Sequence, residues 1–511
     1  MDVMTAMLSL SQDHHHHLAD LSRELLAKRR LILASNRGPV EYYMAENGAG
    51  LQCRRGSGGV VTALSSASQH VEVTWVASAM GEGDRIAAES AQGESLRPPI
   101  AGQNLVLRFV VSPRNVYHKY YNVLCNPLLW FLQHYMWNSP YTPNVGAAAY
   151  DAWVNGYVPV NEAFARAIVE EAQRDEMAPF VMLHDYHLYL TAGYVRQHLP
   201  RAVLQHFIHI PWPAAAYWQL LPSFMRHAIC ENLCSNDIVG LQSQRDVHNF
   251  LHTCESFLEG AEVDYRRRTL WHRGHLTTVN AYPISIDVDG IQRLLRTPRV
   301  REHEEKLRRL IREITLMRVD RVEPSKNIVR GFRAFDMFLE RYPQFRGRLA
   351  FLAFLVPSRT RIRQYRQYMA EVNQIVSVIN AKYGDENWQP ITTFMENNYP
   401  QAIAAMSLYD VLLVNPVIDG MNLVAKEGPV VNRRHGVLIL SETVGAYEQL
   451  GEYAISVAPA DLEGTAQAIY TAITMSKEER RQRAENLRRI VFQEDIITWL
   501  CRQFEDLLAL A

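Results

Sequence analysis

The 511-residue chain has few of the features that mark secreted, membrane or nucleic-acid-binding proteins. Its six cysteines are too few and too scattered for a disulfide framework. No apolar run approaches the ~20 residues that a helix needs to cross a bilayer, and no basic segment followed by an apolar one marks a signal peptide. The net charge of −1 lacks the basic excess typical of a nucleic-acid surface. These absences predict a cytoplasmic protein that binds neither membrane nor nucleic acid.

Signatures of zinc and dinucleotide sites are also missing. Cys230 and Cys234 lie four apart in an expected helix, but no second Cys or His pair stands at ligand spacing, so we interpret them as core residues with zinc as the alternative. The His14 to His17 run is interpreted as a solvated tract, with a metal site as the alternative, and leucines after it predict a short amphipathic helix. No G-x-G-x-x-G spacing follows the first strand.

The composition and the pattern of apolar runs predict a large α/β protein. Hydrophobic residues make up 48% and charged residues 21% of the chain, as in globular proteins, and the length favours two domains. Short apolar runs alternate with helical patterns twice, on either side of a charged stretch at about 287–312. This alternation predicts two Rossmann-like domains that face each other across a cleft.

The predicted domain organisation has four parts. They are an N-terminal extension at 1–29, a first Rossmann-like domain at 30–295, a second at 296–480, and C-terminal helices at 481–511 that pack back towards the first domain.

One stretch, residues 419–427, is the strongest candidate for a ligand site. It follows the apolar run 411–414, turns at Asp419-Gly420, and becomes helical from Met421, which places Glu427 about two turns into the helix. A helix that opens after a glycine turn points backbone N–H groups and a positive dipole end at one place, which suits a diphosphate. The alternative is an ordinary strand–turn–helix corner with a capping Asp.

Polar residues follow several other expected strands. In parallel α/β sheets ligands bind at the carboxyl ends of the strands, so these residues are further candidates. They are Arg37 and the glycine-rich loop 56–59 in the first strand's connection, Asp185, His209, and the pair Arg321 and Lys326. The alternatives are a solvated charge for the basic residues, a helix cap for the aspartate and a structural role for the histidine.

Tyr121 and Trp130 lie in an expected helix and are nine residues apart. At 100° per residue they fall on faces about 180° apart, so both line one site only if the segment bends. Core aromatics are the alternative interpretation.

Together these segments resemble the trehalose-6-phosphate synthase family of retaining glycosyltransferases, which has the GT-B architecture. The resemblance covers about residues 30–500. It is carried by 419–427 and by shorter motifs, which are Ser35-Asn36-Arg37, Gly58-Gly59, Tyr121-Asn122 with Trp130, His184 to Leu188, His209-Ile210-Pro211, Arg321 with Lys326, and Ser358-Arg359.

The resemblance implies a role for each matching position. Catalysis would involve His209, Arg321, Lys326 and Asp419, with Asp419 and His209 holding the transferred glucose. The donor would contact Gly59, Arg321, Lys326, Gly420, Met421, Asn422, Leu423 and Glu427. The acceptor would contact Arg37, Tyr121, Trp130, Asp185 and Arg359.

The reaction implied is transfer of glucose from a nucleotide sugar to glucose 6-phosphate with retention, giving α,α-trehalose 6-phosphate. No matched carboxylate pair of the glycosidase kind is evident. In the family the departing phosphate is thought to take the acceptor proton, so positioning and charge stabilisation are the protein's contribution. Arg321, Lys326 and the helix dipole would supply that charge, so no cofactor and no metal are expected.

Two positions depart from the family pattern. Ser78 stands near the place of an expected tryptophan, and Arg-x-Asp-x-x-Lys-Gly occurs as Arg321-x-Glu323-x-x-Lys326-Asn327. Both departures resemble the branch that makes validoxylamine phosphate from cyclitols, whereas Tyr121, Trp130 and 421–427 resemble the true synthases.

We therefore predict a trehalose-6-phosphate synthase that uses UDP-glucose, with GDP- or ADP-glucose as alternative donors and a homo-oligomer as the alternative to a monomer. One alternative couples a nucleotide-activated sugar or cyclitol to another phosphorylated acceptor. The other is a catalytically silent regulatory subunit that binds sugar phosphate.

Overall fold

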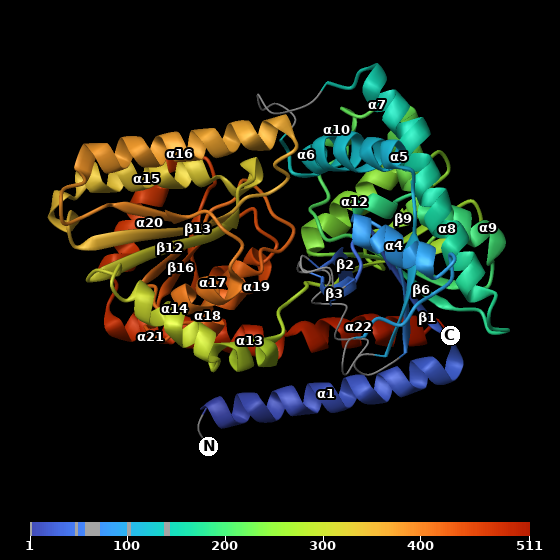
Figure 1. The fold of residues 1–511 in the computed structure, drawn as a ribbon, viewed down its shortest axis with the longest axis horizontal. Coiled ribbons are helices and arrows are strands. Elements are labelled where there is room, and N and C mark those ends of the chain that lie inside the picture. The colour runs from blue at the N-terminus through green and yellow to red at the C-terminus, as the bar shows by residue number, and fades with distance from the viewer. Residues whose placement is uncertain (1–2, 46–49, 57–71, 100–103, 137–143, 511) are drawn as a thin grey trace. The chain divides into compact units, whose positions relative to one another are not determined.

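The computed structural model describes residues 3–45, 50–56, 72–99, 104–136 and 144–510. The chain divides into two compact units (Figure 1). Unit 1 comprises Ser285–Ile496 with the residues up to Ser11, and unit 2 comprises Gln12–Ile284 with the residues from Ile497. The changeovers lie near the predicted boundaries at 296 and 481, which remain predictions of domain limits.

Unit 2 is built on a nine-stranded sheet. Its central strands are buried along their whole length, which is the pattern of a parallel sheet covered on both faces. At one edge of the sheet, three successive strands over 262–281 pair antiparallel with one another. The strand order is β5 (Leu105–Val110), β4 (Val73–Ser78), β1 (Leu31–Ser35), β6 (Phe180–His184), β7 (Val203–Phe207), β8 (Ile238–Leu241), β11 (His275–Ala281), β10 (Thr269–His272) and β9 (Glu262–Asp264).

Helices and a separate hairpin complete unit 2. The hairpin is β2 (Val40–Met44) with β3 (Leu51–Arg55). The helices among the described residues are α1 (Val3–Lys28, whose residues up to Ser11 fall in unit 1), α4 (Glu82–Ser90), α5 (Arg114–His118), η1 (Lys119–Leu129), α6 (Trp130–Gln133), α7 (Ala147–Ala152), η2 (Trp153–Tyr157), α8 (Val158–Ala172), η3 (Tyr186–Leu188), α9 (Thr191–His198), α10 (Ala215–Trp218), α11 (Ser223–Leu233), α12 (Gln244–Phe257) and α22 (Ile496–Leu508).

Unit 1 is built on a six-stranded, all-parallel sheet. Its order is β14 (Ile391–Phe394), β13 (Leu349–Val356), β12 (Ile314–Arg321), β15 (Val411–Val414), β16 (Val437–Ser441) and β17 (Ile455–Val457). Its helices are α13 (Val288–Leu295), α14 (Pro298–Leu307), η4 (Pro324–Lys326), α15 (Ile328–Arg341), η5 (Pro343–Phe345), α16 (Arg363–Tyr383), α17 (Tyr399–Met406), α18 (Val424–Val431), α19 (Tyr447–Leu450), η6 (Gly451–Tyr453), α20 (Leu462–Thr474) and α21 (Lys477–Gln493).

The two sheets share one connectivity. Counted along the chain, the six parallel strands β5-β4-β1-β6-β7-β8 of unit 2 have the spatial order 3-2-1-4-5-6, and so do β14-β13-β12-β15-β16-β17 of unit 1. This is the doubly wound Rossmann order, in which ligands bind beyond the carboxyl ends of strands 1 and 4, where the order reverses. The predicted α/β class is confirmed, and each unit has one such switch point.

The N-terminal helix differs from its prediction. Instead of a short helix around Leu18 to Leu25, α1 runs from Val3 to Lys28, and both leucines are fully buried. The predicted solvated tract is confirmed for His17, which is about half exposed although its Nε2 lies 2.8 Å from Glu505 Oε1 of α22. It is wrong for His14, which is only partly exposed and whose Nδ1 lies 3.2 Å from Thr498 Oγ1.

The core prediction for the cysteine pair holds. Cys230 and Cys234 are buried, and Cys234 Sγ lies 3.8 Å from the Sγ of buried Cys254. Among the residues that the structure describes, no helix is long and apolar enough to cross a membrane.

Candidate functional site

At the switch point of unit 1, the loops after β12 and β15 meet in an ion pair. Lys326 in η4 donates to the carboxylate of Asp419, and both side chains are largely buried. The two residues are 93 apart in the chain, but they follow adjacent strands in register, with Leu316 opposite Val411. The structure therefore brings together two predicted catalytic residues within one unit.

A second, deeper ion pair supports this loop. Arg318 on β12 is fully buried and donates from Nε and Nη2 to Asp320 Oδ2, at 3.0 and 2.8 Å. Its Nη2 also donates to the backbone carbonyl of Lys326 at 3.1 Å. Burial raises the pKa of Asp320, against the opposing charges of Arg318 and Lys326. The backbone of the Lys326 loop is thus tied to a buried guanidinium.

The departure at Asn327 has a structural reason. This residue has φ 57° and ψ 33°, the left-handed region that Asn adopts more readily than most side chains. Its amide donates to the carbonyls of Asn415 at 2.9 Å and Pro459 at 2.7 Å. Asn327 therefore keeps the backbone conformation that glycine would allow and adds two hydrogen bonds that glycine lacks.

The stretch 419–427 forms a tighter turn than the sequence predicts. Asn422 has φ 67°, its amide donates to Asp419 Oδ2 at 3.0 Å, and its Oδ1 accepts from the N–H of Ala425 at 3.2 Å. Because Asn422 interrupts the helical conformation and caps the next turn, α18 begins at Val424. The predicted helix start at Met421 is wrong, and Glu427 lies in the first turn rather than two turns in.

The backbone at the start of this stretch is enclosed by the loop after β16. Gly445 N–H donates to the carbonyl of Asp419, and Ala446 N–H donates to that of Met421, both at 3.1 Å. A Cβ on Gly445 would lie 1.7 Å from the carbonyl oxygen of Gly420, so only glycine permits this approach. Met421 is buried, and Leu423 directly precedes α18.

Glu427 has a partner that the sequence reading missed. The hydroxyl of Tyr399, at the start of α17, donates to Glu427 Oε1 at 2.8 Å. Burial raises the pKa of Glu427, and the hydrogen bond partly offsets this. Tyr399 follows β14. Its position after a strand end was the feature of the sequence that could have marked it as a candidate site residue.

Arg321 and Arg359 share one carboxylate. Arg321 ends β12 and is about half exposed, whereas Arg359 follows β13 and is largely buried. Their Nη1 atoms lie 3.1 and 3.2 Å from Glu323 Oε1. The structure therefore groups Arg359, a predicted acceptor residue, with the predicted donor residues of unit 1.

At the switch point of unit 2, Arg37 follows β1 and is exposed. The preceding Asn36 is buried, and its Oδ1 accepts from Ser78 Oγ at 3.0 Å. Ser78 ends β4 and is itself buried. The departure at Ser78 thus supports Asn36 beside the predicted acceptor arginine.

Asp185, directly after β6, has a strained backbone. Its φ of 73° and ψ of 171° lie in a region that is essentially reserved for glycine. Asp185 Oδ1 accepts from the backbone N–H of His209 at 3.3 Å. Strain of this kind clusters at functional sites, and here it occurs at a predicted acceptor residue.

His209 belongs to a cluster of three histidines with His184 and His206. His184 Nδ1 lies 3.3 Å from His209 Nε2, and His206 Nε2 lies 3.0 Å from the carbonyl of Asp185. Desolvation lowers the pKa of His209 to about 3, helped by His206, and burial lowers that of His206 to about 4. Burial also holds the pKa of His184 well below its usual value. The cluster is neutral at physiological pH, so His209 suits holding a hydroxyl rather than donating a proton as a charged acid.

The Tyr121 segment is a π-helix rather than an α-helix. η1 spans Lys119–Leu129 and contains Pro127. A π-helix has i→i+5 bonding and more residues per turn than an α-helix, so the 100° per residue behind the prediction of opposite faces for Tyr121 and Trp130 does not apply to this segment. Tyr121 stacks on His187, with ring centres 5.8 Å apart, and His187 Nδ1 lies 3.8 Å from Asp185 Oδ2.

Trp130 and Gly59 complete the predicted set. Trp130 is 2% exposed and stacks on His134 with ring centres 4.0 Å apart, so it packs in the core of unit 2 beside the end of η1. Gly59 lies outside the described residues.

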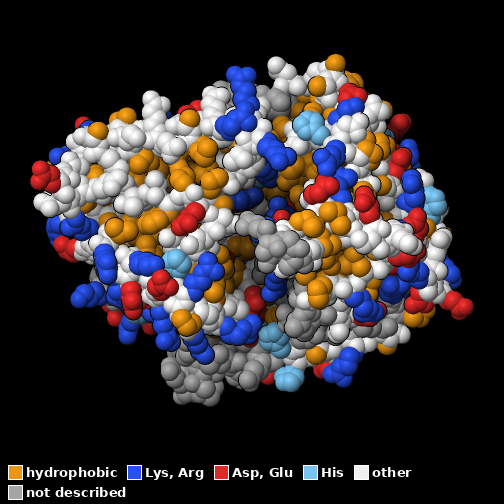
Figure 2. Space-filling model, viewed as in Figure 1, with side chains coloured by type: hydrophobic (Ala, Val, Ile, Leu, Met, Phe, Trp, Pro, Cys, Tyr) orange, Lys and Arg blue, Asp and Glu red, His pale blue; other side chains and the backbone are white. Residues whose placement is uncertain are grey.

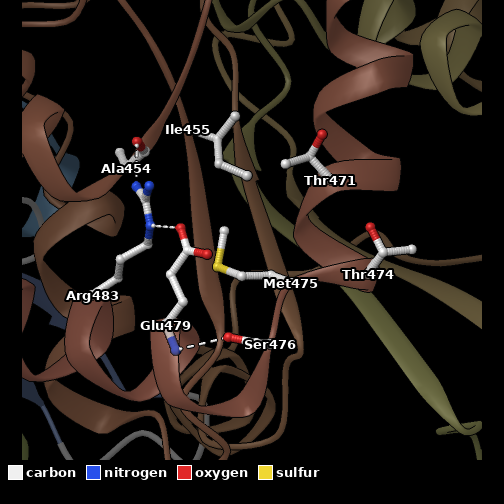
Figure 3. Close-up of a pocket in the computed structure, with 8 residues that line it drawn as sticks. All are labelled: Ala454, Ile455, Thr471, Thr474, Met475, Ser476, Glu479 and Arg483. Atoms are coloured by element: carbon white, nitrogen blue, oxygen red, sulfur yellow. Dashed lines mark hydrogen bonds and ion pairs between the residues drawn. The ribbon is translucent and has the colours of Figure 1, made fainter.

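A cavity of about 410 Å³ lies elsewhere in unit 1 and contains none of the predicted site residues (Figure 3). Its walls include Met475, Thr471 and Thr474, and its one guanidinium, Arg483, is already bonded to Glu479 at 3.0 Å. Within the described parts of the chain, no group of three His, Cys, Asp or Glu side chains is placed to hold a metal ion. Figure 2 shows Asp and Glu side chains among the Lys and Arg side chains on the face in view.

Two Rossmann-ordered units with polar residues at both switch points have the GT-B architecture of nucleotide-sugar-dependent glycosyltransferases. The chain belongs to glycosyltransferase family 20, whose family model matches residues 29–509.

Three relatives illustrate the similarity. The chain is 34% identical over 486 residues to a bifunctional trehalose-6-phosphate synthase/phosphatase of Thermoproteus tenax, covering 92% of this chain and 62% of that relative, so it spans less than two thirds of that protein. It is 28% identical to a validamine 7-phosphate valienyltransferase of Streptomyces hygroscopicus subsp. jinggangensis, over 94% of each chain. It also resembles the crystal structure of a UDP-forming α,α-trehalose-phosphate synthase from Burkholderia xenovorans in complex with glucose-6-phosphate, with a TM-score of 0.79, 25% identity and coverage of 94% and 99%.

Proposed function

We propose that this protein is an α,α-trehalose-6-phosphate synthase that transfers glucose from UDP-glucose to glucose 6-phosphate with retention. The observation that carries the proposal is the switch point of unit 1. There a lysine, an aspartate and an arginine stand at the end of the two central strands, next to the turn that opens α18. The family and the names of the relatives support the same assignment.

In this proposal unit 1 binds the donor. Lys326 and Arg321 would neutralise the diphosphate, the backbone around Asn422 and Leu423 would contact it, and Asp419 would hold the glucose. Glu427, fixed by Tyr399, would accept from the ribose hydroxyls. Cations held in place before the reaction stabilise a departing diphosphate without reorganisation, and the proposal therefore requires no divalent metal or other cofactor.

In unit 2, Asp185, Tyr121 and Arg37 would contact the acceptor. Arg359 is proposed, as the family resemblance implies, to bind the acceptor's phosphate. His209, held neutral by its surroundings, would hold a glucose hydroxyl. Proton transfer would then fall to the departing phosphate. Uridine as the nucleoside of the donor and a homo-oligomeric state remain parts of the prediction.

One observation favours a second candidate. Ser78 is bonded to Asn36 beside Arg37, where the family pattern expects a tryptophan, and the valienyltransferase relative matches over 94% of both chains. The second candidate is a synthase that couples a nucleotide-activated cyclitol to a cyclitol phosphate.

The test is nucleotide release by the purified protein. UDP-, GDP- and ADP-glucose would each be offered with glucose 6-phosphate, with and without EDTA, and a nucleotide-activated cyclitol would also be offered with validamine 7-phosphate. Release of UDP with a phosphorylated, non-reducing disaccharide, unchanged by EDTA, supports the proposal. Release only with the cyclitol phosphate supports the second candidate, and binding without any release supports a silent subunit.

A further inference from the structure

Glu323 is a fully buried carboxylate that lies between Arg321 and Arg359, the two arginines proposed to bind phosphate. It lies in the loop after β12, immediately before η4. Its Oε1 accepts from Ser358 Oγ at 2.8 Å and from Arg359 Nη1 at 3.2 Å, and lies 3.1 Å from Arg321 Nη1. One oxygen atom therefore fixes two guanidinium groups that come from different loops.

The charge of Glu323 is secured by its neighbours. Burial alone would raise the pKa of Glu323, but the charges of Arg321, Arg359 and Lys326 outweigh it and lower the pKa to about 2. Its Oε2 is buried and has no hydrogen-bond partner among the described residues. An ionised buried carboxylate destabilises the fold unless it is paired with cations. We therefore interpret the charge of Glu323 as the partner of the two arginines.

Arg359 is fixed from a second side. Its Nη1 donates to the hydroxyl of Tyr365 at 2.7 Å, and its guanidinium carbon lies 5.3 Å from the centre of that ring. Its backbone has φ 45°, a conformation that non-glycine residues rarely adopt. The Arg359 guanidinium is therefore held in one orientation before any ligand binds.

We propose that Glu323 is a positioning residue that sets both phosphate-binding arginines at once, so that binding of a nucleotide diphosphate and of a phosphate monoester depends on the same carboxylate. The inference rests on the proposed function, which places Arg321 on the donor and Arg359 on the acceptor. It goes beyond that function because it couples the two substrate affinities through a residue that contacts neither.

The first test is Glu323→Gln, which keeps the shape and removes the charge. The KM values for nucleotide sugar and for glucose 6-phosphate are both expected to rise by at least about tenfold, because each arginine loses the charged partner that orients it. Glu323→Asp keeps the charge, and its KM values are expected to lie closer to those of the wild type. A merely structural role would reduce the folded, active fraction and hence kcat, while leaving both KM values unchanged.

Glu304→Gln is the matched control. Glu304 is also a buried carboxylate of unit 1, and it pairs with Arg308 and Arg433, neither of which is a predicted ligand residue. Its variant is expected to keep both KM values. Ser358→Ala is a milder variant in case Glu323→Gln does not fold, because it removes one hydrogen bond to Glu323 without altering either arginine. It is expected to raise both KM values by a similar small factor.

A rise in only one KM, or in neither, would overturn the coupling. Failure of the proposed function is distinguishable, because it would appear in the wild-type enzyme as no nucleotide release. In that case, calorimetric titrations with inorganic pyrophosphate and with glucose 6-phosphate would measure the two affinities in place of the KM values. Parallel weakening of both ligands by Glu323→Gln, and not by Glu304→Gln, supports the inference, and any other pattern contradicts it.

Discussion

Units 1 and 2 have the same strand order, but they hold their predicted site residues by different interactions. In unit 1 the residues are joined by ion pairs, namely Lys326 with Asp419 and the two arginines with Glu323. In unit 2 they are joined by stacked rings and neutral histidines, as in Tyr121 on His187 and His184 beside His209.

The difference shows that one fold can prepare two kinds of binding surface. Opposite charges arranged in advance suit a ligand whose own charge grows as its bond to the sugar breaks. A neutral, aromatic setting with fixed hydrogen bonds suits a ligand whose hydroxyls must be oriented. The three predictions below test this contrast, in order of decreasing expected effect.

The largest effect is expected from removing a charge in unit 1. Lys326→Ala should lower the rate of nucleotide release by at least about 100-fold, as when a charge-stabilising donor is lost. Lys382→Ala is the control, because Lys382 pairs with Asp336 and Glu340 at the exposed surface of the same unit, and its rate should stay near that of the wild type. Near-wild-type turnover in Lys326→Ala would contradict the assignment of Lys326 to the donor site.

A smaller effect is expected at the strained residue beside that lysine. Asn327→Ala removes two hydrogen bonds and leaves at φ 57° an alanine, which lacks the side-chain amide that helps asparagine adopt this conformation. It should reduce the free energy of unfolding by roughly 2–3 kcal/mol. Asn327→Gly should cost less, because glycine adopts this backbone conformation freely. Urea unfolding curves of both variants would decide, and equal losses would show that the conformation itself contributes nothing.

The last effect, about 1.4 kcal/mol for each pH unit, concerns the stability of unit 2 in acid. His206 has a pKa of about 4 in the folded protein and about 6.5 when unfolded, so the unfolded chain takes up the proton first. Its contribution is complete above about pH 6.5 and is lost as the pH falls towards 4, by about 1.4 kcal/mol per pH unit.

His206→Gln should flatten that part of the stability profile, whereas Glu323, with a pKa of about 2, stays ionised throughout this range. Urea unfolding of the wild type and of His206→Gln, followed between pH 7 and pH 4.5, measures this flattening. A profile as steep in His206→Gln as in the wild type would contradict the role given to this histidine.

The sequence allows the strand ends to be predicted but not the exact conformations after them. Continuous apolar runs such as 180–183 and 411–414 are strong signals for buried parallel strands, and polar residues after them must gather at one edge of the sheet. The conformations of Asp185 and Asn422 depend on tertiary contacts that no local pattern encodes.

The π-helix shows the same limit for periodicity. The angle between Tyr121 and Trp130 was derived from 100° per residue, which assumes an α-helix. Pro127 lacks the N–H that an α-helix would use, yet the sequence alone does not show whether the segment bends, ends or widens. The partnership of Tyr399 with Glu427 was likewise unpredictable, because the two residues are 28 positions apart and meet only through the order of the strands.

The position of α22 bears on how the protein is made. This helix is encoded after the whole of unit 1, yet its Trp499 donates to the carbonyl of Tyr282 and packs edge-on against Phe207 of β7. Gln503 in α22 is bonded to buried Gln205 of the same strand. On the ribosome, domains usually fold as units from the N-terminus, but unit 2 cannot complete its core until translation has passed residue 500. Unit 1 is therefore fully synthesised before the unit that precedes it in the chain is finished.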